Sequence, residues 1–418
     1  FEKPAFGSWL PVPPTSVHPA YLVCLAKSSA KFNILISHGH DDHMDDDFIS
    51  LFPKDTTIII PEYKSRGLRS RVERLGFNNI VEAPTSGVEV GSFEIKSYIN
   101  MSISRDDAVV TIASPNSFVI HANDNWQELA GDNLQAIKSD ASSYDPEQIL
   151  YMSQCNLADG FPNIYEDYTM SEKMEIHTNR VDNIISGSLL NASNVGARYF
   201  LNYAGYAAAF LKGDDHLRDL CSFKTNSYIE KARTAEGYDL QIVDMIPGDS
   251  FNFDSVSELF PGVKLDPASL KDSSYEFYER YDRVSGCDTY KNYEVLPQKN
   301  LQERLQDFLN SFSDFVVPRL APTNFNTDIL GFRVAFECSD TGISAEVVVG
   351  GEDRFDGREA VFISHPSLLS EIMRGAINWE NLYIGYGATV RVEPKDVNIR
   401  SVVRWMAMYG YVHQRNMR

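Results

Sequence analysis

The side chains best suited to chemistry lie close together in one segment, Ser37-His-Gly-His-Asp-Asp-His. It follows an apolar stretch, FNILI, with the pattern of a buried strand. Histidines two residues apart on an extended segment point to the same side, so His38 and His40 can bind one metal ion. Asp42 and His43, where the chain turns into a helix, can face a second ion beside it. Imidazole and carboxylate ligands together suit zinc, iron or manganese. A solvated acidic loop is the alternative, because three more aspartates follow closely.

The elements that would position this segment are short strands alternating with helices near the start of the chain. Apolar and β-branched runs predict strands at 32–37, 56–61, 79–83, 88–95, 108–112 and 117–122. A basic helix is predicted around 64–75, and apolar residues at helical spacing predict a helical stretch over 171–212. This alternation argues for an α/β layer structure.

Beyond this region the composition changes twice more. Residues 225–315 are richer in Tyr, Asp, Glu and Lys, which predicts helices with loops. After that, strands are expected at 332–338, 344–349, 360–363 and 387–392, and helices at 366–374 and 397–409. We therefore expect a metal-binding domain at 1–225, a mainly helical connecting region at 226–317 and a small α+β module at 318–418.

The net charge of the chain limits the classes of molecule that it is expected to bind. With 38 Lys and Arg against 58 Asp and Glu, the net charge is −20. Because a surface this acidic repels the phosphate backbone, nucleic-acid binding is not expected. No apolar run approaches the ~18 residues of a membrane helix. The five cysteines are widely spaced and form no CxxC pair, which predicts a reducing, cytoplasmic compartment.

The segment at 37–43 matches the HxHxDH signature, and over roughly residues 15–215 the chain resembles the metallo-β-lactamase superfamily. The resemblance implies an αββα sandwich, with two sheets between helical layers and the metals at one edge. It also implies that an aspartate at the end of a later strand bridges the two metals. Asp124, after SFVIHAN, occupies that place. Asp42 and Asp124 are then the expected catalytic carboxylates.

The chain departs from the superfamily pattern at two ligands. The superfamily usually supplies a histidine between the signature and the bridging aspartate, but alternation along the strand puts His121 on the opposite face from that aspartate. Asp106 or Asp107 stands where the histidine normally falls. A carboxylate there favours iron or manganese over zinc. For the last ligand, commonly a histidine, the candidates are His177 and His216.

Further pieces resemble one branch of the superfamily, the CMP-N-acetylneuraminate hydroxylase-like proteins. They are WLPVPP and HP near the start, NDNW at 123–126, QCN and GFP within 154–162, ARY and YAG within 197–205, and GAINWE at 375–380. Related members of this wider branch include L-ascorbate-6-phosphate lactonases, which hydrolyse, and dinuclear iron hydroxylases, which use O₂. The sialic-acid hydroxylases also carry a Rieske domain, which needs paired Cys and His. No cysteine here lies within two residues of a histidine, so electrons would come from a separate reductase or ferredoxin.

Three functions fit these residues. The favoured one is a dinuclear non-haem iron oxygenase that hydroxylates an organic small molecule with O₂ and external electrons, the metals doing the redox chemistry. The alternative is a dinuclear metal-dependent hydrolase of a phosphoester, lactone or amide, in which the metals lower the pKa of a bridging water. The third is a non-catalytic protein with a degenerate site, which the incomplete ligand set allows.

Contacts to the substrate are a further expectation. Trp126 follows the bridging aspartate closely, and it is expected either to line a substrate pocket or to cover one end of the sandwich. Arg198 and Tyr203 lie in a predicted helix that resembles a substrate-facing element, although aromatic residues at helical spacing are more often part of a core. The basic run from Lys64 to Arg71 is read as a solvated helix face or as a dock for a phosphate or an electron donor.

Overall fold

The computed structural model describes most of the 418 residues. The described residues are 5, 8–11, 19–29, 32–99, 106–125, 131–203, 207–209, 224–245, 249–253, 255–257, 294–320, 327–395 and 397–417. The predicted residues Trp126 and His216 lie outside them.

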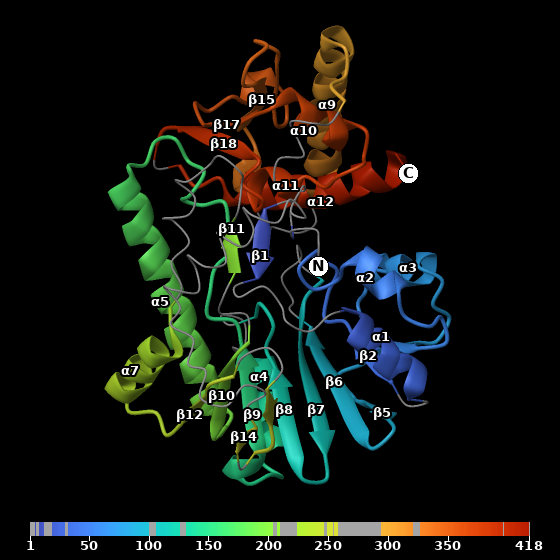
Figure 1. The fold of residues 1–418 in the computed structure, drawn as a ribbon. Coiled ribbons are helices and arrows are strands. Elements are labelled where there is room, and N and C mark those ends of the chain that lie inside the picture. Colours follow the sequence, from blue (N-terminus) through green and yellow to red (C-terminus); the bar gives the residue numbers. More distant parts are fainter. Residues whose placement is uncertain are drawn as a thin grey trace.

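A small parallel sheet carries the first part of the site (Figure 1). Its strands are β2 (Asn33–Leu35), β3 (Thr57–Pro61) and β4 (Ile80–Ala83), in the order β2-β3-β4. The run of three isoleucines in β3 is almost fully buried, as β-branched residues between two packed layers should be. Three helices cover its outer face through a shared apolar cluster: α1 (Pro19–Ser28), α2 (Asp46–Ser50) and α3 (Gly67–Arg74).

A seven-stranded sheet packs beside it, in the order β12-β10-β9-β8-β7-β6-β5. Its strands are β5 (Val88–Val90), β6 (Phe93–Ile99), β7 (Ala108–Ser114), β8 (Ser117–His121), β9 (Ile149–Ser153), β10 (Tyr199–Asn202) and β12 (Gln241–Val243). Strands β5 to β8 pair antiparallel, whereas β8, β9, β10 and β12 pair parallel.

The two sheets lie between helical layers. Ile59 and Ala83 of the small sheet share an apolar cluster with Ile95 and Val110 of the large one. The other face of the large sheet is covered by α4 (Asp132–Ala141), α5 (Met170–Asn194) and α7 (Asn226–Glu236). Helix, sheet, sheet and helix follow one another across this part of the protein, so the predicted α/β fold class and αββα sandwich are confirmed.

The helix expected over 171–212 is too long. Helix α5 ends at Asn194, and Gly196 then adopts a φ of +77°, a left-handed conformation typical of a residue just after a helix. The following Tyr-Phe-Leu-Asn forms β10, because aromatic and apolar side chains here fit the two faces of a sheet. Arg198 and Tyr203 therefore flank a strand and do not lie on a helix.

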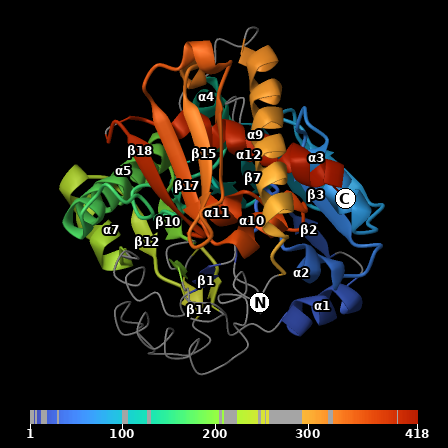
Figure 2. The same cartoon turned by 90° about the horizontal axis from the view of Figure 1, so that it is seen from above.

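A further, four-stranded sheet with its own helices stands over the sandwich (Figures 1 and 2). Its strand order is β16-β15-β17-β18, with β15 (Arg333–Cys338), β16 (Ser344–Val348), β17 (Glu359–Ser364) and β18 (Ala388–Glu393). Its helices are α9 (Gln298–Leu320), α10 (Pro366–Met373), α11 (Glu380–Tyr383) and α12 (Arg400–Met417). We call residues 298–417 the C-terminal module, because these elements share one apolar core.

The division into domains at 225 and 317 stays a prediction, and several elements do not follow it, among them α7, which packs on the large sheet although it lies beyond 225. Helix α9 runs through residue 317 and packs on the sheet of the C-terminal module. Strand β12, from the expected connecting region, is an edge strand of the large sheet. The remaining short pairs are β1 (Trp9–Pro11) with β11 (Ala207–Ala209) and β13 (Ser250–Phe251) with β14 (Val256–Ser257).

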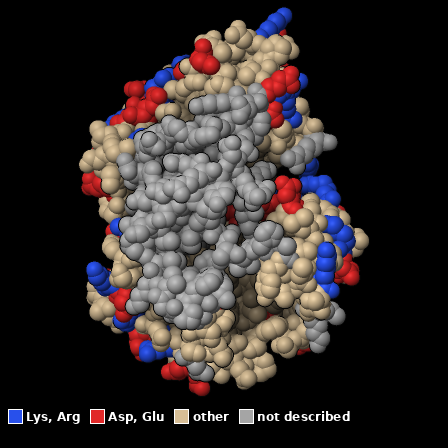
Figure 3. All heavy atoms as spheres, viewed as in Figure 1, with Lys and Arg blue, Asp and Glu red and all other residues tan. Residues whose placement is uncertain are grey.

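The surface mixes both signs of charge where it is described. Beside α2 and α3, Lys and Arg side chains lie next to Asp and Glu (Figure 3), and Arg69 pairs there with Glu73 and Glu82. Of the helices described, none combines the length and the apolar character needed to cross a bilayer.

Candidate metal centre

The signature segment leaves the small sheet just after β2 and turns sharply. Ile36 still pairs with β3 through its N–H and the carbonyl of Ile59. The next carbonyl, that of Ser37, accepts a 2.5 Å hydrogen bond from the Tyr63 hydroxyl. The N–H groups of His43 and Met44 then both donate to the carbonyl of His40, which closes the turn. The chain enters α2 immediately afterwards, with the Asp45 carboxylate accepting from Phe48 N–H as the N-cap.

Arg71 of α3 holds the outside of this turn. Its guanidinium donates to the carbonyls of Gly39 at 2.5 Å and Met44 at 2.9 Å, and to the carboxylate of Asp46 at 2.7 Å. Only a planar, multidentate donor can satisfy acceptors in these different directions at once. The prediction that the basic residues from Lys64 to Arg71 form a solvated helix face is therefore wrong at Arg71. The side chain of Arg71 is only 19% exposed.

We expect Arg71→Ala to lower the free energy of unfolding by about 1–3 kcal/mol, because it leaves two turn carbonyls and a carboxylate without their charged donor. The matched control is Arg69→Ala on the same helix, which removes only surface ion pairs and should cost at most about 1 kcal/mol. Urea unfolding of both metal-free variants measures the difference. Equal losses in the two variants would contradict the clamping role of Arg71.

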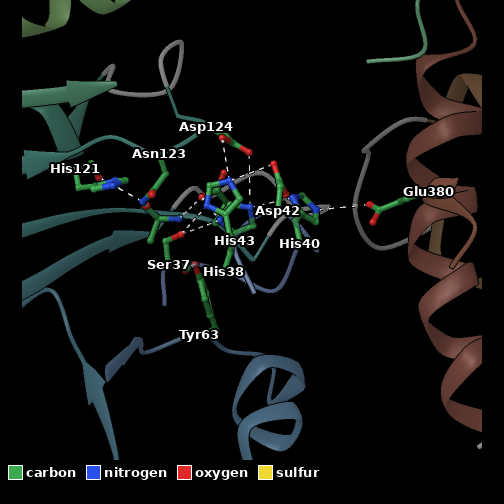
Figure 4. Close-up of polar contacts among 12 residues, drawn as sticks. Ser37, His38, His40, Asp42, His43, Tyr63, His121, Asn123, Asp124 and Glu380 are labelled. Atoms are coloured by element: carbon green, nitrogen blue, oxygen red, sulfur yellow. Dashed lines mark hydrogen bonds and ion pairs between the residues drawn. The ribbon is translucent and has the colours of Figure 1, made fainter. Parts of the chain in front are cut away.

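The donor atoms of three predicted ligands converge at the end of the turn (Figure 4). Nε2 of His38 lies 2.9 Å from Nδ1 of His40, and 3.6 Å from Oδ2 of Asp124. One ligand atom from each of the three lies within 4.8 Å of the other two. Two imidazole nitrogens and a carboxylate oxygen, converging from different elements, form a donor set that fits zinc, manganese or iron.

A second group of donors continues on the other side of Asp124. Its Oδ1 lies 3.5 Å from Nε2 of His43, and that nitrogen is also 3.5 Å from Oδ2 of Asp42. The two oxygens of Asp124 thus face two different histidines, an arrangement that would let this one carboxylate contact two ions. The hydroxyl of Ser37 lies 3.1 Å from Nδ1 of His38 and 3.3 Å from Nδ1 of His43, so it helps to orient both rings.

Burial and neighbouring charges shift the pKa of three members of this cluster. Burial alone would lower the pKa of His43, but Asp124 and Asp42 outweigh it and raise that pKa to about 9. Burial opposes ionisation of Asp124, yet His43 and the neighbouring histidines hold its pKa well below the usual range. Burial raises the pKa of Asp42. Asp124 is therefore ionised at neutral pH and offers two anionic oxygens to a cation.

The two candidate aspartates before β7 have different environments. Asp106 is exposed and accepts a hydrogen bond from the Ser65 hydroxyl. Asp107 is buried, and its Oδ1 lies 3.5 Å from Nδ1 of His38, the ring nitrogen that is turned away from the converging donors. Asp107 and the nearer Ser37 hydroxyl thus both face Nδ1 of His38, which leaves its Nε2 toward the converging donors.

His121, Tyr203 and Arg198, which the sequence also singled out, are not among the converging donors. His121 is separated from the cluster by Asn123 (Figure 4), and burial followed by the positive charge of His43 lowers its pKa to about 4. Its ring lies 4.5 Å from that of Tyr203, just after β10, whose buried hydroxyl has no hydrogen-bond partner among the described residues. Arg198, at the opposite end of β10, donates to the exposed Asp239.

His177 is buried on α5, the helix that covers the outer face of the large sheet, and burial followed by the charge of Arg180 lowers its pKa to about 4. It is not among the three converging ligands. Glu380, the last residue of the GAINWE segment and not a predicted ligand, does reach them: its Oε1 lies 3.6 Å from Nε2 of His40. It lies more than 300 positions from the signature, so no local spacing could have linked the two.

The comparisons with known proteins give only distant similarity. No protein-family profile matches the chain, and no curated protein does. An isothiocyanate hydrolase from Delia radicum gut bacteria is 15% identical over 56% of this chain and 79% of its own, with a TM-score of 0.30. A possible metal-dependent hydrolase from Veillonella parvula is 13% identical over 59% and 86%, with a TM-score of 0.33.

The metallo-beta-lactamase fold protein YhfI from Bacillus subtilis is 15% identical over 50% of this chain and 73% of its own, with a TM-score of 0.29. Because all these values are low, the function has to be derived from the residues of the site itself.

Proposed function

We propose that the protein is a metal-dependent hydrolase with two divalent ions, acting on a phosphoester, lactone or amide. The observation that carries this proposal is Asp124, whose two oxygens face His38 on one side and His43 on the other at 3.5–3.6 Å. A divalent ion bound there would lower the pKa of a water molecule and polarise the bond to be cleaved. The signature histidines and Asp124 hold the ions, and Asp42, next to His43, is placed to take a proton from water.

The placement of Asp106 and Asp107 weakens one of the two arguments for the iron oxygenase. That argument is a carboxylate in place of the usual histidine ligand, and the other is the resemblance to the hydroxylase-like branch. Asp106, however, bonds to Ser65, and Asp107 faces the outward nitrogen of His38. The converging donors are then two imidazoles and one carboxylate, a set found both in zinc hydrolases and in non-haem iron enzymes, so the ligands alone no longer favour iron. Hydrolysis also needs no external electron donor.

The test uses the metal-free chain reloaded separately with Zn²⁺, Mn²⁺ and Fe²⁺. Each form is assayed against chromogenic phosphomonoesters and phosphodiesters, a set of lactones and a set of aryl amides. We expect one class to be cleaved by the loaded chain, with the activity lost in Asp124→Ala and kept in Asp41→Asn. Oxygen uptake by the iron form with a chemical reductant, without cleavage of any class, would instead support the oxygenase.

A further inference from the structure

We propose that Glu380 of the C-terminal module is the positioning residue for the metal ligand His40. This inference rests on the proposed metal site and extends it to a part of the chain outside the sandwich. His40 directs Nδ1 toward His38, at 2.9 Å, and its other ring nitrogen toward Oε1 of Glu380, at 3.6 Å (Figure 4). A negative carboxylate this close to Nε2 favours the tautomer with the proton on Nε2, in which Nδ1 would present its lone pair to an ion.

Glu380 is itself held in place by hydrogen bonds. It is 5% exposed, and a carboxylate that deeply buried is stable only when its oxygens are paired. Its second oxygen, Oε2, accepts from the Tyr411 hydroxyl of α12 at 2.9 Å and from the Asn378 amide at 3.3 Å. Its other oxygen, Oε1, faces His40 of the sandwich.

The position of α11, which begins at Glu380, is fixed from the sandwich side as well. The hydroxyls of Tyr383 and Tyr165 lie 3.0 Å apart, and Asn163 donates to the Tyr386 hydroxyl at 2.5 Å. A side chain at Gly160 would meet the carbonyl of Tyr383 at 2.7 Å, so the two backbones approach too closely for any residue but glycine. Several contacts share the docking of α11, so the loss of one hydrogen bond among them should leave its distance from the signature turn unchanged.

The same arrangement then occurs twice at this site. Asp107 faces the outward nitrogen of His38, and Glu380 faces the outward nitrogen of His40. The first partner comes from the sandwich and the second from the C-terminal module. Full metal affinity therefore requires the C-terminal module to be docked, which gives the module a role beyond stability.

The test is the affinity of the full chain for Zn²⁺, measured by competition with a chromogenic chelator at fixed pH, together with the absorption spectrum of the Co²⁺ form. We expect Glu380→Ala to weaken Zn²⁺ binding about 10- to 100-fold and to change the Co²⁺ spectrum. Glu380→Gln, which keeps an acceptor oxygen, should recover part of that loss. Zinc affinity in both variants is compared with that of the unsubstituted chain.

Two controls separate positioning from stability. Glu371→Gln removes a carboxylate of the same module that pairs with Arg374, and Tyr165→Phe removes a hydrogen bond of the domain interface. Both should bind Zn²⁺ as the unsubstituted chain does, whatever their melting temperatures. Unchanged affinity in Glu380→Ala, or equal weakening in Tyr165→Phe, overturns the positioning role alone. No Zn²⁺ binding by the unsubstituted chain overturns the metal site and the positioning role together.

Discussion

Replacing Asp124 by alanine is expected to abolish binding of both ions. The residue supplies the only carboxylate whose two oxygens face His38 and His43 among the described residues of the cluster. Losing a partner behind a metal-bound histidine costs about 10- to 100-fold in affinity, and losing a shared ligand should cost more than that. The measurement is Zn²⁺ affinity by competition with a chromogenic chelator.

Asp41→Asn is the matched control for this variant. Asp41 belongs to the same signature segment, but its side chain is 42% exposed and faces Arg71 at 3.4 Å. Its removal should leave metal affinity within about twofold, because a weak, exposed ion pair is all that is lost. Two ions retained by Asp124→Ala, or equal losses in the two variants, would contradict the proposed ligand set.

The second large effect is expected from Trp379→Ala. The indole is 1% exposed, and its ring lies 4.8 Å from Phe362 and 5.9 Å from Phe336 in the core of the C-terminal module. Removing a buried aromatic side chain costs about 3–5 kcal/mol, since the cavity collapses only in part. Gly410 packs directly against it, so little can move in to fill the space. Chemical denaturation monitored by far-ultraviolet circular dichroism measures the loss.

Phe355→Ala provides the control for Trp379, because this ring is 39% exposed and packs on Arg333 at the surface of the same module. Its loss should cost no more than about 1 kcal/mol. Because Trp379 directly precedes Glu380, its removal should also weaken Zn²⁺ binding, whereas Phe355→Ala should not. A destabilisation of Trp379→Ala below 1 kcal/mol would show that the core does not depend on this side chain.

Much of the fold follows from local sequence patterns. The apolar runs before and after the signature segment are strands where they were predicted, because β-branched residues in short runs have few other stable arrangements. The error at 171–212 has a physical cause. Apolar residues at helical spacing continue past Asn194, and only the left-handed Gly196 ends the helix before β10.

The site shows where local patterns stop being informative. The signature residues and Asp124 were predicted, and the structure brings His38, His40 and Asp124 together. The choice between Asp106 and Asp107 could not be made, because neighbouring positions differ only in the direction that the folded chain gives them. Arg71 and Glu380 contact the turn through tertiary packing alone, so no spacing in the sequence indicates them.

Metal stoichiometry tests the central claim most directly. The unsubstituted chain and His38→Ala are each loaded with Zn²⁺, freed of excess metal by gel filtration and analysed for metal and protein content. The proposed site predicts about two ions per unsubstituted chain and a loss of bound metal in His38→Ala, with both proteins folded. An unsubstituted chain that retains no metal, or a variant that retains as much as the unsubstituted chain, would contradict it.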